Sequence, residues 1–119
     1  MANDKSFKIK NGLSVGTRYL QTGVAMAAND VDLSLGNYFT KTISGATAIT
    51  FTNAPASGLA VGFSVEINGD GSAITWPASV KWHEATAPTA TATKELYTFV
   101  TTDGGTTYYG KKAAEGLSS

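Results

Sequence analysis

The single histidine, His83, is the first candidate for chemistry, and it lacks the partners that nucleophilic catalysis requires. A Ser-His-Asp arrangement needs a histidine held between a serine nucleophile and a carboxylate. His83 lies beside Glu84 at the edge of an expected loop, and no serine stands in a Gly-x-Ser-x-Gly pattern. The chain has no cysteine, which excludes a thiolate nucleophile and a cysteine zinc site. We therefore expect a structural or surface histidine and no catalytic or metal-binding residues.

Carboxylate pairs are the second candidate, because two suitably spaced acids can hydrolyse a glycosidic bond. The evident pairs are Glu66 with Asp70 and Glu84 with Glu95. Both pairs lie on or near expected turns, where acidic residues are common. The sequence therefore favours an ordinary structural role for these four acids.

Residues 68–72 place oxygen-bearing side chains at alternate positions, as the start of a calcium loop does. That loop requires glycine at its sixth position and an acid at its twelfth, where this chain has Ala73 and Ser79. The glycine pairs in 69–71 and 104–105 are followed by no Lys-Ser or Lys-Thr, so they are not phosphate loops. All these segments are predicted to be turns, and no cofactor is expected.

Aromatic side chains gather in the C-terminal half and could stack on a sugar ring or fill a core. Tyr108 and Tyr109 are adjacent, so on a strand they point to opposite faces and one of them should be exposed. Trp82, Tyr108 and Tyr109 are therefore the candidate exposed aromatic contacts.

Short strands separated by Gly, Asn and Asp turns must position these residues. The clearest strand is 59–67, where five bulky side chains alternate with small ones. Alternation also predicts strands in 31–35, 47–51 and 96–101, whereas 24–28 is expected to form a helical turn. This pattern predicts an all-β fold, an antiparallel β-sandwich or a jelly-roll-like domain.

The expected organisation is one domain with two appendages. Residues 1–18 form a basic arm, 19–110 the β-domain and 111–119 a flexible polar tail. In the arm, Asn11-Gly12 separates two short alternating runs, 7–10 and 13–15, which predicts a β-hairpin. No apolar run approaches the about 20 residues needed to cross a bilayer, so no membrane association is expected.

Charge is scarce and unevenly placed. Charged residues make up 15% of the 119 residues, and nine basic residues balance nine acidic ones. A neutral chain lacks the clustered positive charge of nucleic-acid binding, so we expect no nucleic-acid partner. Residues 1–18 nevertheless carry four basic residues against one acidic residue. The candidate partner-binding residues of the arm are Lys5, Phe7, Lys8, Ile9, Lys10, Leu13 and Arg18.

Three segments together resemble a module found in virion structural proteins of tailed bacteriophages. They are 59–67, 74–82 with Thr-Trp-Pro-x-Ser-Val-Lys-Trp, and 96–110 with Asp-Gly-Gly-Thr-Thr-Tyr-Tyr-Gly. The leader 7–13 is similar to the start of small virion proteins of marine phages, notably those of cyanobacteria. The resemblance covers residues 32–110 and implies a non-enzymatic protein of the virion, assembled in the host bacterial cytoplasm.

The resemblance implies two functions, and the aromatic residues leave a third open. The first is a capsid decoration (cement) protein that binds the major capsid protein or other virion proteins in many copies, as a homo-oligomer with a trimer expected. The second is a tail-fibre, tail or knob component, for which a host glycan is the expected ligand. The third is a free carbohydrate-binding module. The chain shows no heptad repeat or long fibre shaft, which favours decoration.

Overall fold

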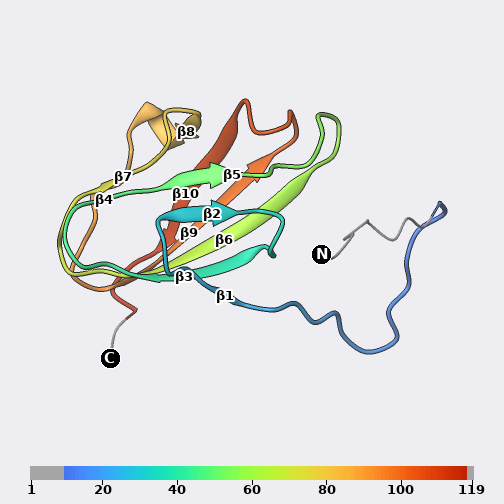
Figure 1. The fold of residues 1–119 in the computed structure, drawn as a ribbon, viewed down its shortest axis with the longest axis horizontal. Coiled ribbons are helices and arrows are strands. Elements are labelled where there is room, and N and C mark those ends of the chain that lie inside the picture. Colours follow the sequence, from blue (N-terminus) through green and yellow to red (C-terminus); the bar gives the residue numbers. More distant parts are fainter. Residues whose placement is uncertain (1–9, 118–119) are drawn as a thin grey trace.

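The computed structural model describes residues 10–117 and consists mainly of β-strands (Figure 1). Its main element is a six-stranded sheet in the order β1-β3-β6-β9-β10-β8. The strands are β1 (Val24–Ala25), β3 (Tyr38–Thr42), β6 (Val61–Asn68), β8 (Val80–Trp82), β9 (Lys94–Thr101) and β10 (Tyr108–Ala114). The all-β class predicted from the sequence is confirmed.

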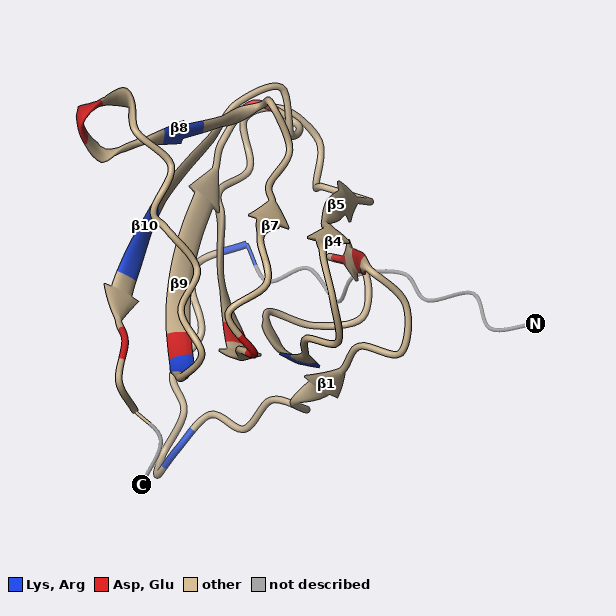
Figure 2. Cartoon of the chain, turned by 90° about the vertical axis from the view of Figure 1, so that its left-hand side faces the viewer, with Lys and Arg blue, Asp and Glu red and all other residues tan. Residues whose placement is uncertain are grey.

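A second, smaller layer lies against one face of this sheet (Figures 1 and 2). It consists of two pairs, β2 (Asp30–Asp32) with β5 (Thr50–Thr52) and β4 (Thr47–Ala48) with β7 (Ile74–Thr75). One short 3-10 helix, η1 (His83–Ala85), follows β8. The two layers make the fold β-sandwich-like.

The core fills the space between the layers. Period-2 alternation on β6 and β9 sends every second side chain inward, where it is removed from water. Aromatic rings from both layers meet there, and Phe51 of β5 contacts Phe99 of β9 at a centroid distance of 5.1 Å. The buried hydrophobic residues are Val31, Phe39, Ile43, Ile49, Phe63, Val65, Ile67, Trp76, Val80, Tyr97, Phe99 and Tyr108.

The strand pairing is mixed, which corrects the antiparallel arrangement expected from the sequence. Only β6–β9 and β9–β10 are antiparallel, whereas β1–β3, β3–β6 and β8–β10 are parallel. The two pairs of the second layer are also parallel. The cause is the path of the chain: after β1 and again after β3 it crosses into the second layer, and then returns to the large sheet in its original direction. Parallel neighbours require crossovers of this kind.

Three local predictions are also corrected. Residues 24–28, expected to form a helical turn, begin with strand β1, and the Met26 amide donates to the Thr40 carbonyl at 2.8 Å. The predicted tail 111–119 is partly ordered, because β10 continues to Ala114 in register with β9. In the arm, 13–15 forms no strand. The other half of the predicted hairpin, 7–9, lies outside the described residues.

Candidate functional site

The outward face of the six-stranded sheet carries the candidate site. One face of this sheet packs on the second layer, and the side chains between the inward ones point to the opposite face. On that face Tyr109 is 62% exposed and Val100 38% exposed. These are large apolar side chains that the described residues leave accessible.

Strand register gathers the site around Tyr109. Tyr109 of β10 pairs with Lys81 of β8 on one side and with Val100 of β9 on the other. Lys111 lies two residues further along β10, on the same face, opposite Thr98. Two lysines therefore neighbour the exposed tyrosine, one across the strand pair and one along the strand.

A shallow depression of about 670 Å³ lies over these strands. No acidic residue of the part of the chain that the structure describes lines it, although the whole chain has as many acidic as basic residues. An aromatic ring with two neighbouring ammonium groups suits contact with a protein surface or with a sugar that carries negative charge. The lining residues are Lys81, Trp82, His83, Thr98, Phe99, Val100, Tyr109, Gly110 and Lys111.

A second depression of about 630 Å³ adjoins the first and shares Trp82, His83 and Lys111 with it. Its wall is the loop that follows β8. In this loop Glu84 and Ala85 both adopt left-handed backbone conformations, with φ of 53° and 59°. Two consecutive left-handed residues other than glycine are strained, and such strain persists only where the surroundings hold it.

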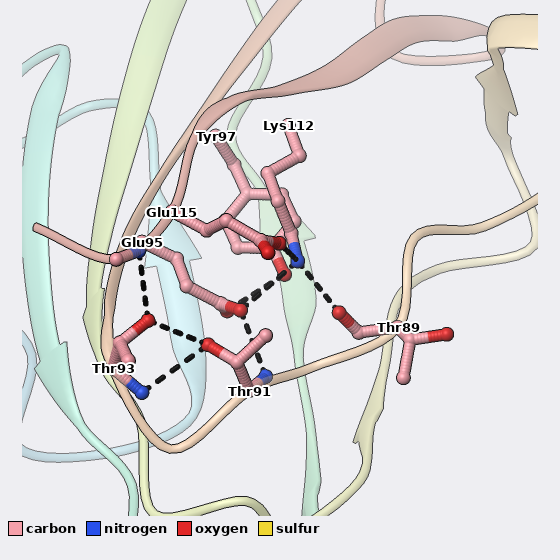
Figure 3. Close-up of polar contacts among 8 residues, drawn as sticks. Thr89, Thr91, Thr93, Glu95, Tyr97, Lys112 and Glu115 are labelled. Atoms are coloured by element: carbon pink, nitrogen blue, oxygen red, sulfur yellow. Dashed lines mark hydrogen bonds and ion pairs between the residues drawn. The ribbon is translucent and has the colours of Figure 1, made fainter.

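A buried ion pair holds the far end of this loop against the sheet (Figure 3). Lys112 Nζ donates to Glu95 Oε2 at 3.0 Å, to Glu115 Oε1 at 2.9 Å and to the Thr89 carbonyl at 2.6 Å. The Thr91 amide donates to Glu95 Oε2 at 2.8 Å. The Glu95 side chain is fully buried, and that of Lys112 is 11% exposed. The pair therefore joins β9, β10 and the loop that borders the second depression.

The pKa values of this cluster follow from its geometry. Burial acts to raise the pKa of the Glu95 carboxyl, but hydrogen bonds from Lys112, Thr91 and Tyr97 outweigh burial and hold the pKa below its ordinary value. Burial likewise acts to lower the pKa of Lys112, and Glu115 and Glu95 reverse this and raise it. Burial and the Glu95 carboxylate raise the pKa of Tyr97. Glu95 and Lys112 are therefore both charged at neutral pH.

The three aromatic candidates differ in their exposure to solvent. Tyr109 is exposed, whereas Tyr108 is 3% exposed and part of the core, so Tyr108 is not an exposed contact. The reason is the alternation of the strand, which turns one of two adjacent residues inward. Trp82 is half-buried and borders both depressions, with its ring 5.9 Å from that of Trp76. Of the predicted exposed contacts, Trp82 and Tyr109 therefore belong to the candidate site.

The arm candidates that the structure describes do not line this site. Lys10, Leu13 and Arg18 are exposed and lie in the segment that precedes β1. The others, Lys5, Phe7, Lys8 and Ile9, lie outside the described residues.

The members of each candidate carboxylate pair lie in different surroundings. The Glu84 side chain is 82% exposed, whereas that of Glu95 is fully buried and paired with Lys112. Glu66 accepts a hydrogen bond from the Tyr38 hydroxyl at 2.6 Å and lies 3.6 Å from Lys94. Asp70 instead accepts from the amides of Gly45 and Ser72, as a turn residue does. These contacts support the structural roles expected for both acids.

Sequence reasoning missed the lysines of the site and the Glu95–Lys112 pair. Lys81 becomes a neighbour of Tyr109 only through pairing between distant strands. Lys111 stands two positions after Tyr109, so alternation along one strand is a signal that could have found it. For Glu95 a signal was present, because it falls in period 2 with Tyr97 and Phe99. That spacing places its carboxylate on the inward face, where a cation must accompany it.

Comparisons with protein-family models, with curated proteins and with solved structures find no match to this chain. Within residues 10–117 no group of three or more acidic or histidine side chains lies close enough to hold a metal ion. No helix of the same residues is long and apolar enough to cross a membrane.

Proposed function

We propose that this chain is a non-enzymatic structural protein of a tailed-bacteriophage particle, and that it decorates the outer capsid shell in many copies. The observation that carries the proposal is the accessible sheet face around Tyr109, which presents apolar side chains and two lysines. The resemblance of residues 32–110 to a virion module supports the same class of protein.

The mechanism is burial of this face against the shell. Tyrosine and other aromatic side chains are enriched at protein interfaces because they bury a large area with few rotatable bonds. Lys81 and Lys111 add attraction to an acidic partner surface. Because the protein binds assembled shells and not free subunits, binding stabilises the shell by mass action.

A tail or knob component that recognises a host glycan is the second candidate, and the same depression favours it. An exposed tyrosine beside two lysines suits a sugar ring that bears carboxylate or sulfate groups. A free carbohydrate-binding module would use the same residues. These alternatives predict sugar affinity in the isolated protein, whereas decoration predicts affinity for empty shells.

Replacing Tyr109 with serine tests the site. We expect Tyr109→Ser to weaken cosedimentation with shells that lack the protein by at least about tenfold, the cost of removing a central interface aromatic. The matched control is Leu59→Ser, which changes another apolar residue, 60% exposed, outside the depression. Equal binding by Tyr109→Ser and the unchanged protein would contradict the proposed face. Sugar binding with no shell binding would establish the second candidate instead.

A further inference from the structure

The segment 10–23, which we call the arm segment, has no part in the two layers. All of its residues are exposed. On the N-terminal side of β1 the segment extends to one side of the two layers (Figure 1). Four large apolar side chains lie within eight residues of it. They are Leu13, Val15, Tyr19 and Leu20, which are 66%, 46%, 67% and 71% exposed. Such a concentration of exposed apolar residues marks a surface that another molecule covers.

The charge of the chain divides at the end of the arm segment. Residues 1–23 contain four basic residues and one acidic residue, which gives a net charge of +3. Residues 24–119 contain five basic and eight acidic residues, which gives a net charge of −3. The neutrality of the whole chain therefore conceals two parts of opposite charge, and each part is complementary to the other.

Strand β2 carries two aspartates, Asp30 and Asp32. Asp30 accepts hydrogen bonds from the hydroxyls of Thr50 and Thr52, and Asp32 accepts from Ser34 and Asn53. No ion pair between described residues reaches either aspartate. Buried Val31 lies between them, so both carboxylates point outward. This part of the surface therefore presents fixed negative charge.

The basic residues of the layers lie elsewhere. Figure 2 shows those of β8 and β10 on one side of the molecule, and β5, the partner of β2, on the other. Lys41 is occupied by hydrogen bonds to the carbonyls of Ala27 and Ala28. Among described residues β2 pairs with β5 alone, so its other edge is open to a further strand. The exposed Leu35 follows it and offers an apolar contact.

The arm segment is long enough to reach another molecule. Its 14 residues, when extended, span up to about 46 Å. The two shorter dimensions of the molecule are 31 Å and 30 Å. A neighbouring copy that presents its own β2 therefore lies within reach.

We propose that the arm segment of each copy binds a second copy of this chain along the open edge of β2, beside Asp30 and Asp32. The positive charges of the arm face these carboxylates, and its apolar side chains gain cover beside Leu35. Addition of an extended segment to a sheet edge is a known mode of recognition. The inference adds a partner for the arm to the proposed function and does not depend on what the Tyr109 face binds.

Sedimentation equilibrium of the full chain, in the absence of shells, tests this inference. We expect an oligomer at concentrations from about 1 to about 100 µM. Raising the salt from about 50 to about 500 mM should weaken association, because salt screens exposed charges. The double variant Tyr19→Ser, Leu20→Ser should associate at least about tenfold more weakly. Its melting temperature extrapolated to dilute protein should be unchanged, since both side chains are exposed.

Two further variants make the test specific. Asp30→Asn preserves the shape of the side chain and removes its charge, so it should weaken association as well. Leu59→Ser changes an apolar residue, 60% exposed, outside the arm segment and β2, and should associate like the unchanged protein. A monomer at every concentration, or unchanged association in the double arm variant, would overturn the inference. Neither result bears on shell binding, which the Tyr109 variant tests separately.

Discussion

Replacing Lys112 with methionine is expected to lower the free energy of unfolding at pH 7 by about 3 to 5 kcal/mol, the usual cost of removing one partner of a buried ion pair. The Glu95 carboxylate is fully buried, and Lys112 is the cation that it contacts, at 3.0 Å. Methionine fills a similar volume but leaves this negative charge without compensation. Urea denaturation followed by tryptophan fluorescence measures the difference.

The effect of this substitution should depend on pH in a defined direction. In the unchanged protein the pKa of Glu95 lies below its ordinary value of 4.5. Its contribution to stability is therefore complete above pH 4.5 and is lost as the pH falls through the lowered value. Removing Lys112 takes away a hydrogen bond that lowers the pKa of Glu95, so this pKa should be higher in the variant and protonation should relieve the unpaired charge at a higher pH. The difference in unfolding free energy between Lys112→Met and the unchanged protein should therefore become smaller as the pH is lowered from 7 to 4.5.

The double variant Glu95→Gln, Lys112→Met is the control. It removes both charges, so no buried carboxylate is left unpaired, and it should be more stable than Lys112→Met alone. If Lys112→Met and the unchanged protein unfold at the same urea concentration, the buried pair does not hold the loop and the sheet together.

Replacing Phe99 with alanine is the second substitution with a large expected effect, about 3 to 5 kcal/mol of unfolding free energy. Phe99 is 3% exposed, and its ring lies 5.1 Å from Phe51, 5.2 Å from Phe63 and 5.2 Å from Trp76. Gly110 faces it so closely that an added Cβ would lie 2.6 Å from the ring. Truncation would thus leave a cavity between the two layers.

The neighbouring residue supplies a matched control. Val100 is adjacent in β9 but points to the outward face, where it is 38% exposed. Val100→Ala should therefore change the unfolding free energy by less than about 1 kcal/mol. Phe99→Leu retains most of the side-chain volume, so its loss of unfolding free energy should lie between those of Phe99→Ala and Val100→Ala. Similar losses for Phe99→Ala and Val100→Ala would contradict the assignment of inward and outward faces.

The sequence predicts the strands better than their arrangement. Alternation in 59–67 and 96–101 identifies two strands whose inward side chains form much of the core, because period 2 is a local property. The crossings between the layers are not local, and no turn residue encodes whether β3 and β6 run parallel. The antiparallel expectation failed for this reason.

In the candidate site, too, the sequence predicts local features but not contacts between distant segments. Adjacency of Tyr108 and Tyr109 indicates that one of them is exposed, and alternation places Lys111 on the same face as Tyr109. Only strand register shows that Lys81 also neighbours Tyr109. The tail was predicted to be flexible because of its polar composition. In the structure Lys112 instead forms a hydrogen bond with Glu95, which lies 17 positions earlier. The composition of the tail gives no indication of this contact.

The proposed role in the virion is tested most directly by counting copies of this chain in purified particles of tailed phages whose genomes carry its sequence, by quantitative mass spectrometry against the major capsid protein. A decoration protein should be present in on the order of hundreds of copies per particle, because a symmetric shell repeats its surface many times. A count of a few to a few dozen copies would place the chain in the tail. Its absence from the particle would contradict the account.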